Sequence, residues 1–203
     1  MKHSTVGIID YGIGNHASVA HSLRDIGFRV RVSADMEVLN EVDILLLPGV
    51  GAYPSAMRAL HERGLVHYLQ DQAREQRPII GICLGMQLLA SASHELHYTV
   101  GLDLIPGEVV PLTEPKWHIG WNTIECVQDD PLFGPSDGQA FYFNHSFMYQ
   151  GPAEYQVCVS RHPTPIPSVI RRGNIIGLQF HPEKSQAAGK ALLKNIISRL
   201  AHA

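Results

Sequence analysis

The chain has 203 residues, of which 45% are apolar and 17% are charged, and its formal net charge is −3. A chain of this length can bury a large core, so we expect one domain over residues 1–203. The charge balance predicts no nucleic-acid partner and no binding to an anionic membrane. The apolar run from Val6 to Ile9 is too short for a signal sequence or a membrane span, which predicts a cytoplasmic protein.

The first half of the chain alternates between buried strands and amphipathic helices. Continuous apolar runs separated by such helices are typical of a parallel sheet that is covered on both faces. We therefore expect an α/β fold with an open, mostly parallel sheet and helices on both faces. Strands are predicted at Thr5–Asp10, Phe28–Val32, Asp43–Pro48 and Pro78–Ile82, and helical stretches at about 15–26, 53–75 and 84–89.

The pattern changes between Gly101 and Gly177, where short strands alternate with turn signals. This change predicts antiparallel additions to the sheet in the second half of the chain. A hairpin is expected near Gly173-Asn174, and residues 188–201 read as a closing amphipathic helix. The other predicted strands lie within 101–112, 121–127, 140–146 and 155–160.

One strand-to-helix turn has the form of a dinucleotide-binding loop. "GIGNHA", residues 12–17, fits G-x-G-x-x-A, and Asp35 follows at a suitable distance to hold a ribose. Any tight turn between a strand and a helix favours glycine, so the motif alone has low specificity. A nicotinamide-dependent oxidoreductase that uses Gly12, Gly14 and Asp35 remains open as an alternative.

Two groups of residues resemble metal or disulfide sites without completing them. "HELH", residues 94–97, lacks the second histidine of a zinc-binding helix, because Tyr98 stands at that position. We therefore predict a loop or a solvated helix end there, and neither a metal nor a cofactor in the protein. Cys126 and Cys158 lie in apolar, strand-like surroundings, and we interpret them as two buried thiols.

The strongest local signal is "GICLG", residues 81–85, which has the form of a nucleophile elbow with cysteine as the nucleophile. The two glycines allow a sharp turn that exposes Cys83 at the end of a strand. The helix that begins at Leu84 points its N-terminus at the sulfur, which favours the thiolate. The Leu84 amide can stabilise an oxyanion. The five residues of this motif alone do not exclude that Cys83 is a buried structural cysteine.

Two further segments supply what a nucleophile needs. In "QFHPEKS", His181 stands at the end of an apolar strand, and Glu183 lies close enough to orient its imidazole. Sites in open parallel sheets gather at the carboxyl ends of strands, where both Cys83 and His181 fall. In "LPGVGAY", residues 47–53, a loop after a buried strand can offer backbone amides to a developing negative charge.

Together, "PGVG", "GICLGMQLL" and "HPEKS" resemble the class I glutamine amidotransferases of the triad type. Within that class, "IIDYGIGN", "LPGVGAY", "GLDLIPGEV", "HIGWN", "FYFNHS" and "QFHPEKSQ" are similar to the branch that supplies ammonia for histidine biosynthesis. The resemblance covers nearly the whole chain. It implies a glutaminase that forms a heterodimer with a cyclase subunit, a (β/α)₈ barrel that receives the ammonia through an internal tunnel.

The resemblance also implies a role for each matching residue, with L-glutamine as the substrate. Cys83 would be the nucleophile, His181 the acid and base, and Glu183 the orienting carboxylate. The other implied roles are the oxyanion hole (Leu84 with Val50 or Gly51), substrate binding (Gln87, His145, Ser146 and Phe147) and the partner interface (Asn15, Trp121 and Lys184).

Two segments depart from the family pattern. "KWHIGWN", residues 116–122, has Trp117 where a proline is usual, and "RHPTPIPSVIRR", residues 161–172, contains three prolines where tyrosine and alanine are usual. Both departures bear on the ammonia acceptor rather than on glutamine hydrolysis. A related subunit pair supplies ammonia for amidating a surface sugar, and this route stays open as a second alternative.

Overall fold

The computed structural model of the chain describes residues 4–201, so the outer ends of the expected 1–203 domain lie outside the described part. The elements are β1 (Thr5–Ile9), α1 (His16–Asp25), β2 (Arg29–Ser33), α2 (Met36–Asn40), β3 (Ile44–Leu47), α3 (Tyr53–Glu62), α4 (Leu65–Arg74), β4 (Ile79–Ile82), α5 (Leu84–Leu88), β5 (Ala92–Ser93), β6 (Thr99–Val100), β7 (Glu108–Pro111), β8 (His118–Thr123), β9 (Glu125–Cys126), β10 (Ala140–His145), β11 (Phe147–Gln150), β12 (Gln156–His162), β13 (Thr164–Arg172), β14 (Ile175–Leu178) and α6 (Gln186–Leu200).

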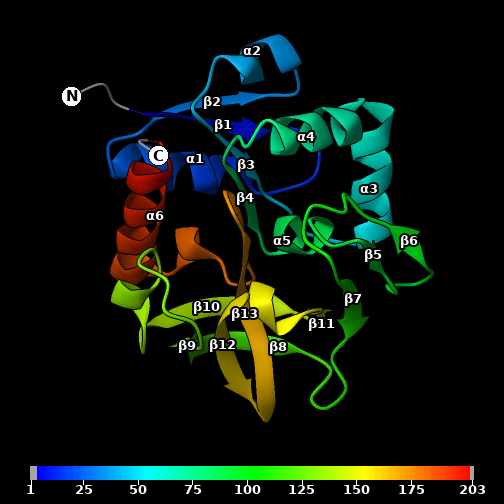
Figure 1. Cartoon of the computed structure of the whole chain (residues 1–203), viewed down its shortest axis with the longest axis vertical. Coiled ribbons are helices and arrows are strands. Elements are labelled where there is room, and N and C mark those ends of the chain that lie inside the picture. The colour runs from blue at the N-terminus through cyan, green and yellow to red at the C-terminus, as the bar shows by residue number, and fades with distance from the viewer. Residues whose placement is uncertain (1–3, 202–203) are drawn as a thin grey trace.

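An eight-stranded sheet forms the centre of the molecule, in the order β2-β1-β3-β4-β14-β13-β12-β9. The first five strands are parallel and the last three pairings are antiparallel. β13 and β14 form the predicted hairpin, closed between Arg172 and Ile175. In Figure 1, α1 and α6 lie on one side of the parallel strands, and α3, α4 and α5 lie on the other. The predicted mixed α/β fold is therefore confirmed.

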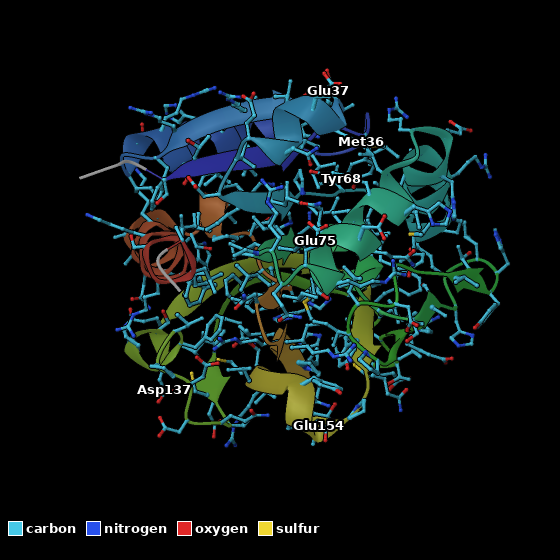
Figure 2. All side chains as sticks on the ribbon, turned by 45° about the horizontal axis from the view of Figure 1, so that its top comes forward. Met36, Glu37, Tyr68, Glu75, Asp137 and Glu154 are labelled. Carbon is cyan, nitrogen blue, oxygen red and sulfur yellow. The ribbon has the colours of Figure 1, made fainter. Side chains whose placement is uncertain are left out.

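Alternate residues of the central strands point to opposite faces of the sheet, as the pleat requires. In β3, Ile44 and Leu46 join the core beneath α1 and α6, whereas Leu45 and Leu47 join the core beneath α3 and α4. A side-chain hydrogen bond also joins α4 to α2. The hydroxyl of Tyr68, which Figure 2 labels on α4, donates a hydrogen bond to Asn40 Oδ1 at the end of α2.

Two smaller sheets stand at the carboxyl end of the parallel strands. β8 pairs with β10, and β11, β7, β5 and β6 form a second, four-stranded sheet. Residues 101–107, part of a predicted strand, contain no strand, and β7 begins only at Glu108. Gly64, with a φ of 68°, divides the expected 53–75 stretch into α3 and α4. In the described residues, no helix is long and apolar enough to cross a membrane.

Candidate active site

Cys83 stands in the turn between β4 and α5, and its backbone is strained. Its φ of 55° and ψ of −110° lie in a region that residues with a side chain rarely adopt. The flanking glycines make this turn possible. A Cβ at Gly81 would lie 2.5 Å from the Gly85 carbonyl oxygen, and one at Gly85 would lie 1.9 Å from the Leu47 oxygen. The structure thus has the geometry of the predicted elbow.

His181 and Glu183 form a buried pair just beyond β14. His181 Nδ1 lies 2.8 Å from Glu183 Oε1, which leaves Nε2 as the ring nitrogen able to exchange a proton with Cys83. Burial acts to lower the pKa of His181, but hydrogen bonding and charge from Cys83 and Glu183 outweigh it and raise that pKa to about 10. The pair therefore favours an imidazolium at neutral pH.

The predicted catalytic and substrate residues meet at one cavity of about 290 Å³, with Glu183 directly behind His181. Sequence reasoning missed Glu95 and Asn144 there, and it assigned Lys184 to the partner interface only. Glu95 lies in a bend far from the conspicuous motifs. Its only local signal is its place in the "HELH" segment, which resembles a metal-binding helix. The cavity is lined by Val50, Gly51, Cys83, Leu84, Gln87, Glu95, Asn144, His145, Ser146, Phe147, His181 and Lys184.

Backbone amides border the cysteine on two sides. Among the described residues, no protein group accepts a hydrogen bond from the amides of Val50, Gly51 or Leu84. The Leu84 amide opens α5, and the first amides of a helix lack partners within the helix. The other two belong to the loop after β3. The buried Tyr11 hydroxyl holds the start of this loop through a 2.8 Å hydrogen bond to the Pro48 oxygen.

Polar groups of both charges line the rest of the cavity. Gln87 donates from Nε2 to the Phe147 oxygen (3.1 Å) and to Gln179 Oε1 (3.2 Å), so its own Oε1 stays available as an acceptor. Glu95 accepts a hydrogen bond from the Tyr53 amide at 2.9 Å. A carboxylate and the Lys184 ammonium in one small cavity suit a zwitterionic ligand such as an amino acid.

A chain of hydrogen bonds runs from β8 into the cavity wall. His145 Nδ1 lies 2.8 Å from the Phe147 oxygen and must donate to it, so His145 Nε2 accepts from His118 Nδ1 at 3.0 Å. His118 Nε2 in turn accepts from Asn122 Nδ2. Burial, reinforced by neighbouring histidines, lowers the pKa of His118 to about 3 and that of His145 to about 4. Both imidazole rings are neutral, as this series of hydrogen bonds requires.

Of the three residues assigned to a partner interface, Lys184 lines the cavity, whereas Trp121 and Asn15 do not. Trp121 is half-exposed and packs edge-on against the Tyr142 ring, at 6.2 Å between centroids. The Lys184 ammonium group lies over the same Tyr142 ring, with Nζ 5.9 Å from the ring centroid. Asn15 has a structural role as well, because its side chain accepts from the Ser18 amide and caps α1.

The alternative sites are not supported by the geometry. Asp35 caps α2 by accepting a hydrogen bond from the Glu37 amide at 2.9 Å, so its carboxylate is already used in folding. Residues 94–97 form neither helix nor strand, and 95–97 form bends, as expected for a loop. No cluster of metal-ligating side chains occurs within residues 4–201. Cys158 is buried as predicted, but Cys126 is only half-buried, which corrects the interpretation of both as buried thiols.

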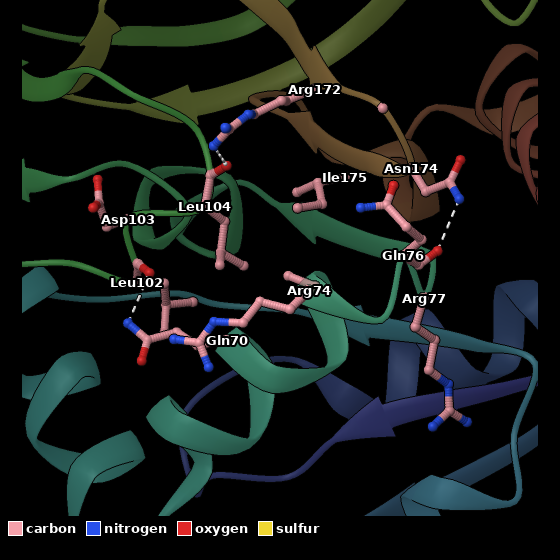
Figure 3. A pocket seen from close by; sticks show the side chains of 12 residues that line it. Gln70, Arg74, Gln76, Arg77, Leu102, Asp103, Leu104, Arg172, Asn174 and Ile175 are labelled. Carbon is pink, nitrogen blue, oxygen red and sulfur yellow. Dashed lines mark hydrogen bonds between the residues drawn. The ribbon is translucent and has the colours of Figure 1, made fainter.

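A second cavity, of about 450 Å³, lies at the opposite end of the sheet, before the first residues of β4 and β14 (Figure 3). Two of its three arginines hold backbone carbonyl groups in place. Arg172 donates to the Leu104 oxygen, and Arg77 donates to the Leu39 and Asn40 oxygens. No pair of nucleophile and base lines this cavity, in contrast to the cavity around Cys83.

The chain matches one protein family over almost its full length. The family described as "Glutamine amidotransferase class-I" matches residues 7–200. The chain is 44% identical over 191 residues to the imidazole glycerol phosphate synthase subunit HisH of Listeria monocytogenes, covering 92% of each chain. It is 42% identical over 193 residues to the subunit of the same name from Bacillus cereus, covering 94% of this chain and 92% of that one.

Solved structures share the fold at lower sequence identity. A glutamine amidotransferase from Thermotoga maritima matches with a TM-score of 0.74 and 17% identity, covering 100% of each chain. PurLQS from the same organism matches with a TM-score of 0.77 and 17% identity, covering 98% of this chain and 99% of that one. These matches extend the likeness to the whole arrangement of the sheet and its helices.

Proposed function

Because this chain belongs to the class I glutamine amidotransferases, we propose that it is the glutaminase subunit of an imidazole glycerol phosphate synthase, as its relatives are named. The observation that carries the proposal is the convergence of Cys83, the His181–Glu183 pair and unpaired backbone amides on one small cavity. The relatives favour this acceptor route over amidation of a surface sugar.

The reaction follows from the positions of these groups. The Cys83 thiolate attacks the side-chain carbonyl carbon of glutamine, and the Leu84 amide with that of Val50 or Gly51 binds the developing oxyanion. The His181 imidazolium gives its Nε2 proton to the departing nitrogen, so that ammonia leaves and a glutamyl thioester remains. His181 then removes a proton from water, which attacks the thioester and releases glutamate and the Cys83 thiolate.

The substrate is held by groups around the cysteine. Gln87, His145, Ser146 and Phe147 bind glutamine in this proposal. Glu95 pairs with the α-ammonium group of glutamine, and Lys184 lies on the side of its α-carboxylate. Glu183 keeps the His181 ring in the orientation and tautomer that proton transfer requires.

Free ammonia is protonated in neutral water and loses its reactivity as a nucleophile. The proposal therefore includes a heterodimer with a (β/α)₈ cyclase subunit that receives ammonia through a tunnel, making the assembly a lyase. Asn15, Trp121 and Lys184 face that partner. We place the heterodimer in the cytoplasm, where a nucleophilic cysteine such as Cys83 is kept as a thiol. Residues 1–203 act in it as one domain.

The test is glutamate release by the chain purified with the cyclase subunit from the same genome. With the formimino carboxamide ribotide present, we expect glutamine turnover coupled to imidazole glycerol phosphate formation. Cys83→Ala should reduce turnover by about 10⁴-fold, because no other group supplies the nucleophile. Cys126→Ser, a change at a cysteine outside the cavity, serves as the control and should keep parental turnover.

Two results would contradict the proposal. Turnover that persists in Cys83→Ala would show that another nucleophile is used. Turnover that appears only with a sugar-amidating enzyme would assign the ammonia to the other acceptor route. Cys83→Ala should still bind the cyclase subunit, because the side chain lies inside the cavity and not on the outer surface.

A further inference from the structure

Two cysteines that are 32 positions apart in the sequence face each other across β9 and β12. The register of the antiparallel pair places Cys126 directly opposite Cys158. Their sulfur atoms lie 3.0 Å apart, and both cysteines are free. Neither takes part in the glutaminase chemistry, so the pair needs a separate explanation.

The backbone around the pair has the geometry that a disulfide requires. The neighbouring Val127 amide donates to the Val157 oxygen, whereas the Cys126 amide donates to Asp137 Oδ1 and not across the ladder. Cys126 and Cys158 therefore form a non-hydrogen-bonded pair, in which Cα atoms are about 4.5 Å apart and side chains are closest. That separation falls within the range that disulfides span, about 4.4–6.8 Å.

An external reagent can reach one of the two sulfurs but not the other. Cys126 is half-buried on β9, the outermost strand of the large sheet, and Cys158 is fully buried on β12. Exposed Asp137, which holds the Cys126 amide, lies at the margin of the molecule (Figure 2). An oxidant therefore meets Cys126 first, and Cys158 is in place to react second.

We propose that Cys126 and Cys158 form a reversible intrachain disulfide by exchange with a small-molecule disulfide such as oxidised glutathione. The Cys126 thiolate attacks one sulfur of the reagent, the reagent's S–S bond breaks, and one thiolate leaves. The Cys158 thiolate then attacks the Cys126 sulfur and expels the second thiolate. The protein loses two electrons and two protons, and the reagent is reduced to two thiols.

The disulfide closes a covalent loop around the segment that lines the glutamine cavity. Residues 127–157 contain β10 and β11, and therefore His145, Ser146 and Phe147. Burial raises the pKa of both thiols, and for Cys158 the contact with Cys126 adds to that rise. Because the thiolate is the reacting form, closure is slow at neutral pH and faster at alkaline pH.

The experiment treats the full chain with oxidised glutathione and follows intact mass and non-reducing peptide maps. A Cys83→Ser background keeps the cavity cysteine from reacting. We expect loss of two hydrogens, a cross-link between the peptides that carry Cys126 and Cys158, and complete reversal by dithiothreitol. We also expect oxidation to raise the unfolding temperature by several degrees, because a loop of this length restricts the unfolded chain.

Single variants separate this disulfide from surface oxidation in general. Cys158→Ser should trap one glutathione on Cys126, because the second exchange step is lost, and Cys126→Ser should leave buried Cys158 unmodified. Neither variant should gain thermal stability on oxidation. A parental chain that keeps glutathione on Cys126 without closing, or a cross-link that leaves the unfolding temperature unchanged, would overturn the proposal.

Discussion

The backbone around Cys83 has little conformational freedom. Its positive φ places the sulfur at the N-terminus of α5, and Gly81 and Gly85 permit the close backbone contacts behind it. His181 faces the same cavity and is held from behind by Glu183, which is itself almost fully buried. The buried carboxylate is thus responsible both for the orientation of the imidazole and for part of its raised pKa.

Glu183→Gln should therefore change the pH dependence as well as the rate. Loss of the negative charge lowers the pKa of His181 from about 10, so the alkaline limb of the profile of kcat/KM against pH should move toward neutral pH. The rate at the optimum should fall by about 10²–10⁴-fold. Glu108→Gln, which changes the exposed His94–Glu108 pair, is the matched control. An alkaline limb that stays in place would refute this role.

Tyr11 offers a second prediction at the residue scale. Tyr11→Phe removes the hydrogen bond that fixes Pro48 at the start of the amide-bearing loop. We expect kcat for glutamine hydrolysis to fall about tenfold, the equivalent of one ordinary hydrogen bond, with little change in KM. The measurement is steady-state glutaminase kinetics in the presence of the partner.

Tyr149→Phe is the matched control for this change. Its hydroxyl also donates to a proline carbonyl, that of Pro106, from a buried position outside the cavity. Both variants should lose stability, but only Tyr11→Phe should lose activity. Equal losses of activity in the two variants would mean that the Tyr11 hydrogen bond contributes to folding alone.

At the scale of elements, sequence patterns predicted those strands and turns that are determined by residues close together in the sequence. The apolar strands β1, β3 and β4 and the sharp turn at Cys83 were confirmed because each is specified by neighbouring residues. The five-residue helix α2 was missed because it is too short to show a helical period. The contact of Cys126 with Cys158 was missed because only the pairing of β9 with β12 creates it.

The two segments that depart from the family pattern illustrate the same limit. The Trp117 oxygen lies 3.0 Å from His162 Nε2, and the His118 and His162 rings stack with centroids 4.4 Å apart. The segments at 116–122 and 161–172 therefore contact each other. Two sequence departures that look independent are joined in one structural region, which no local pattern reveals.

The pairing of β8 with β10 predicts sensitivity to acid. His118 and His145 stay neutral in the fold, with pKa values of about 3 and 4, whereas in the unfolded chain each gains a proton below about pH 6.5. The unfolded state thus binds more protons, and stability falls as pH falls from about 6.5 to 4. Each histidine contributes at most about 1.4 kcal/mol per pH unit.

His118→Asn should show this effect in urea unfolding at pH 7 and pH 5. The variant should be less stable than the parent at pH 7, because a buried stack is lost, but its stability should fall less steeply toward pH 5. The exposed His67→Asn is the control and should keep the parental slope. A slope in His118→Asn as steep as the parent's would exclude this pair as the cause.

At the scale of the whole molecule, the two faces of β8 connect the wall of the cavity around Cys83 to the outer surface. His118 and Asn122 point inward to the hydrogen-bonded chain, while Ile119 and Trp121 alternate with them and are exposed. Trp121 contacts Tyr142, and Lys184 contacts the same ring from the cavity side. A partner that docks on this surface would therefore lie beside the cavity around Cys83, which Lys184 lines.

Trp121→Ala should separate docking from hydrolysis. A large exposed aromatic at the centre of an interface commonly carries a substantial share of the binding energy, so the Kd for the cyclase subunit should rise by about 10–100-fold. Basal glutamine hydrolysis by the isolated chain should stay within about twofold, because Trp121 does not line the cavity. Calorimetric titration and a glutaminase assay measure the two quantities.

The control is Val32→Ala, an exposed apolar side chain on β2 at the far edge of the large sheet. It should change neither binding nor turnover. At saturating partner concentration, Trp121→Ala should also deliver less of its ammonia to the acceptor, because the cover over the cavity is incomplete. An unchanged Kd together with unchanged coupling of glutamine use to acceptor conversion would place the partner on a different surface and remove Trp121 from the interface.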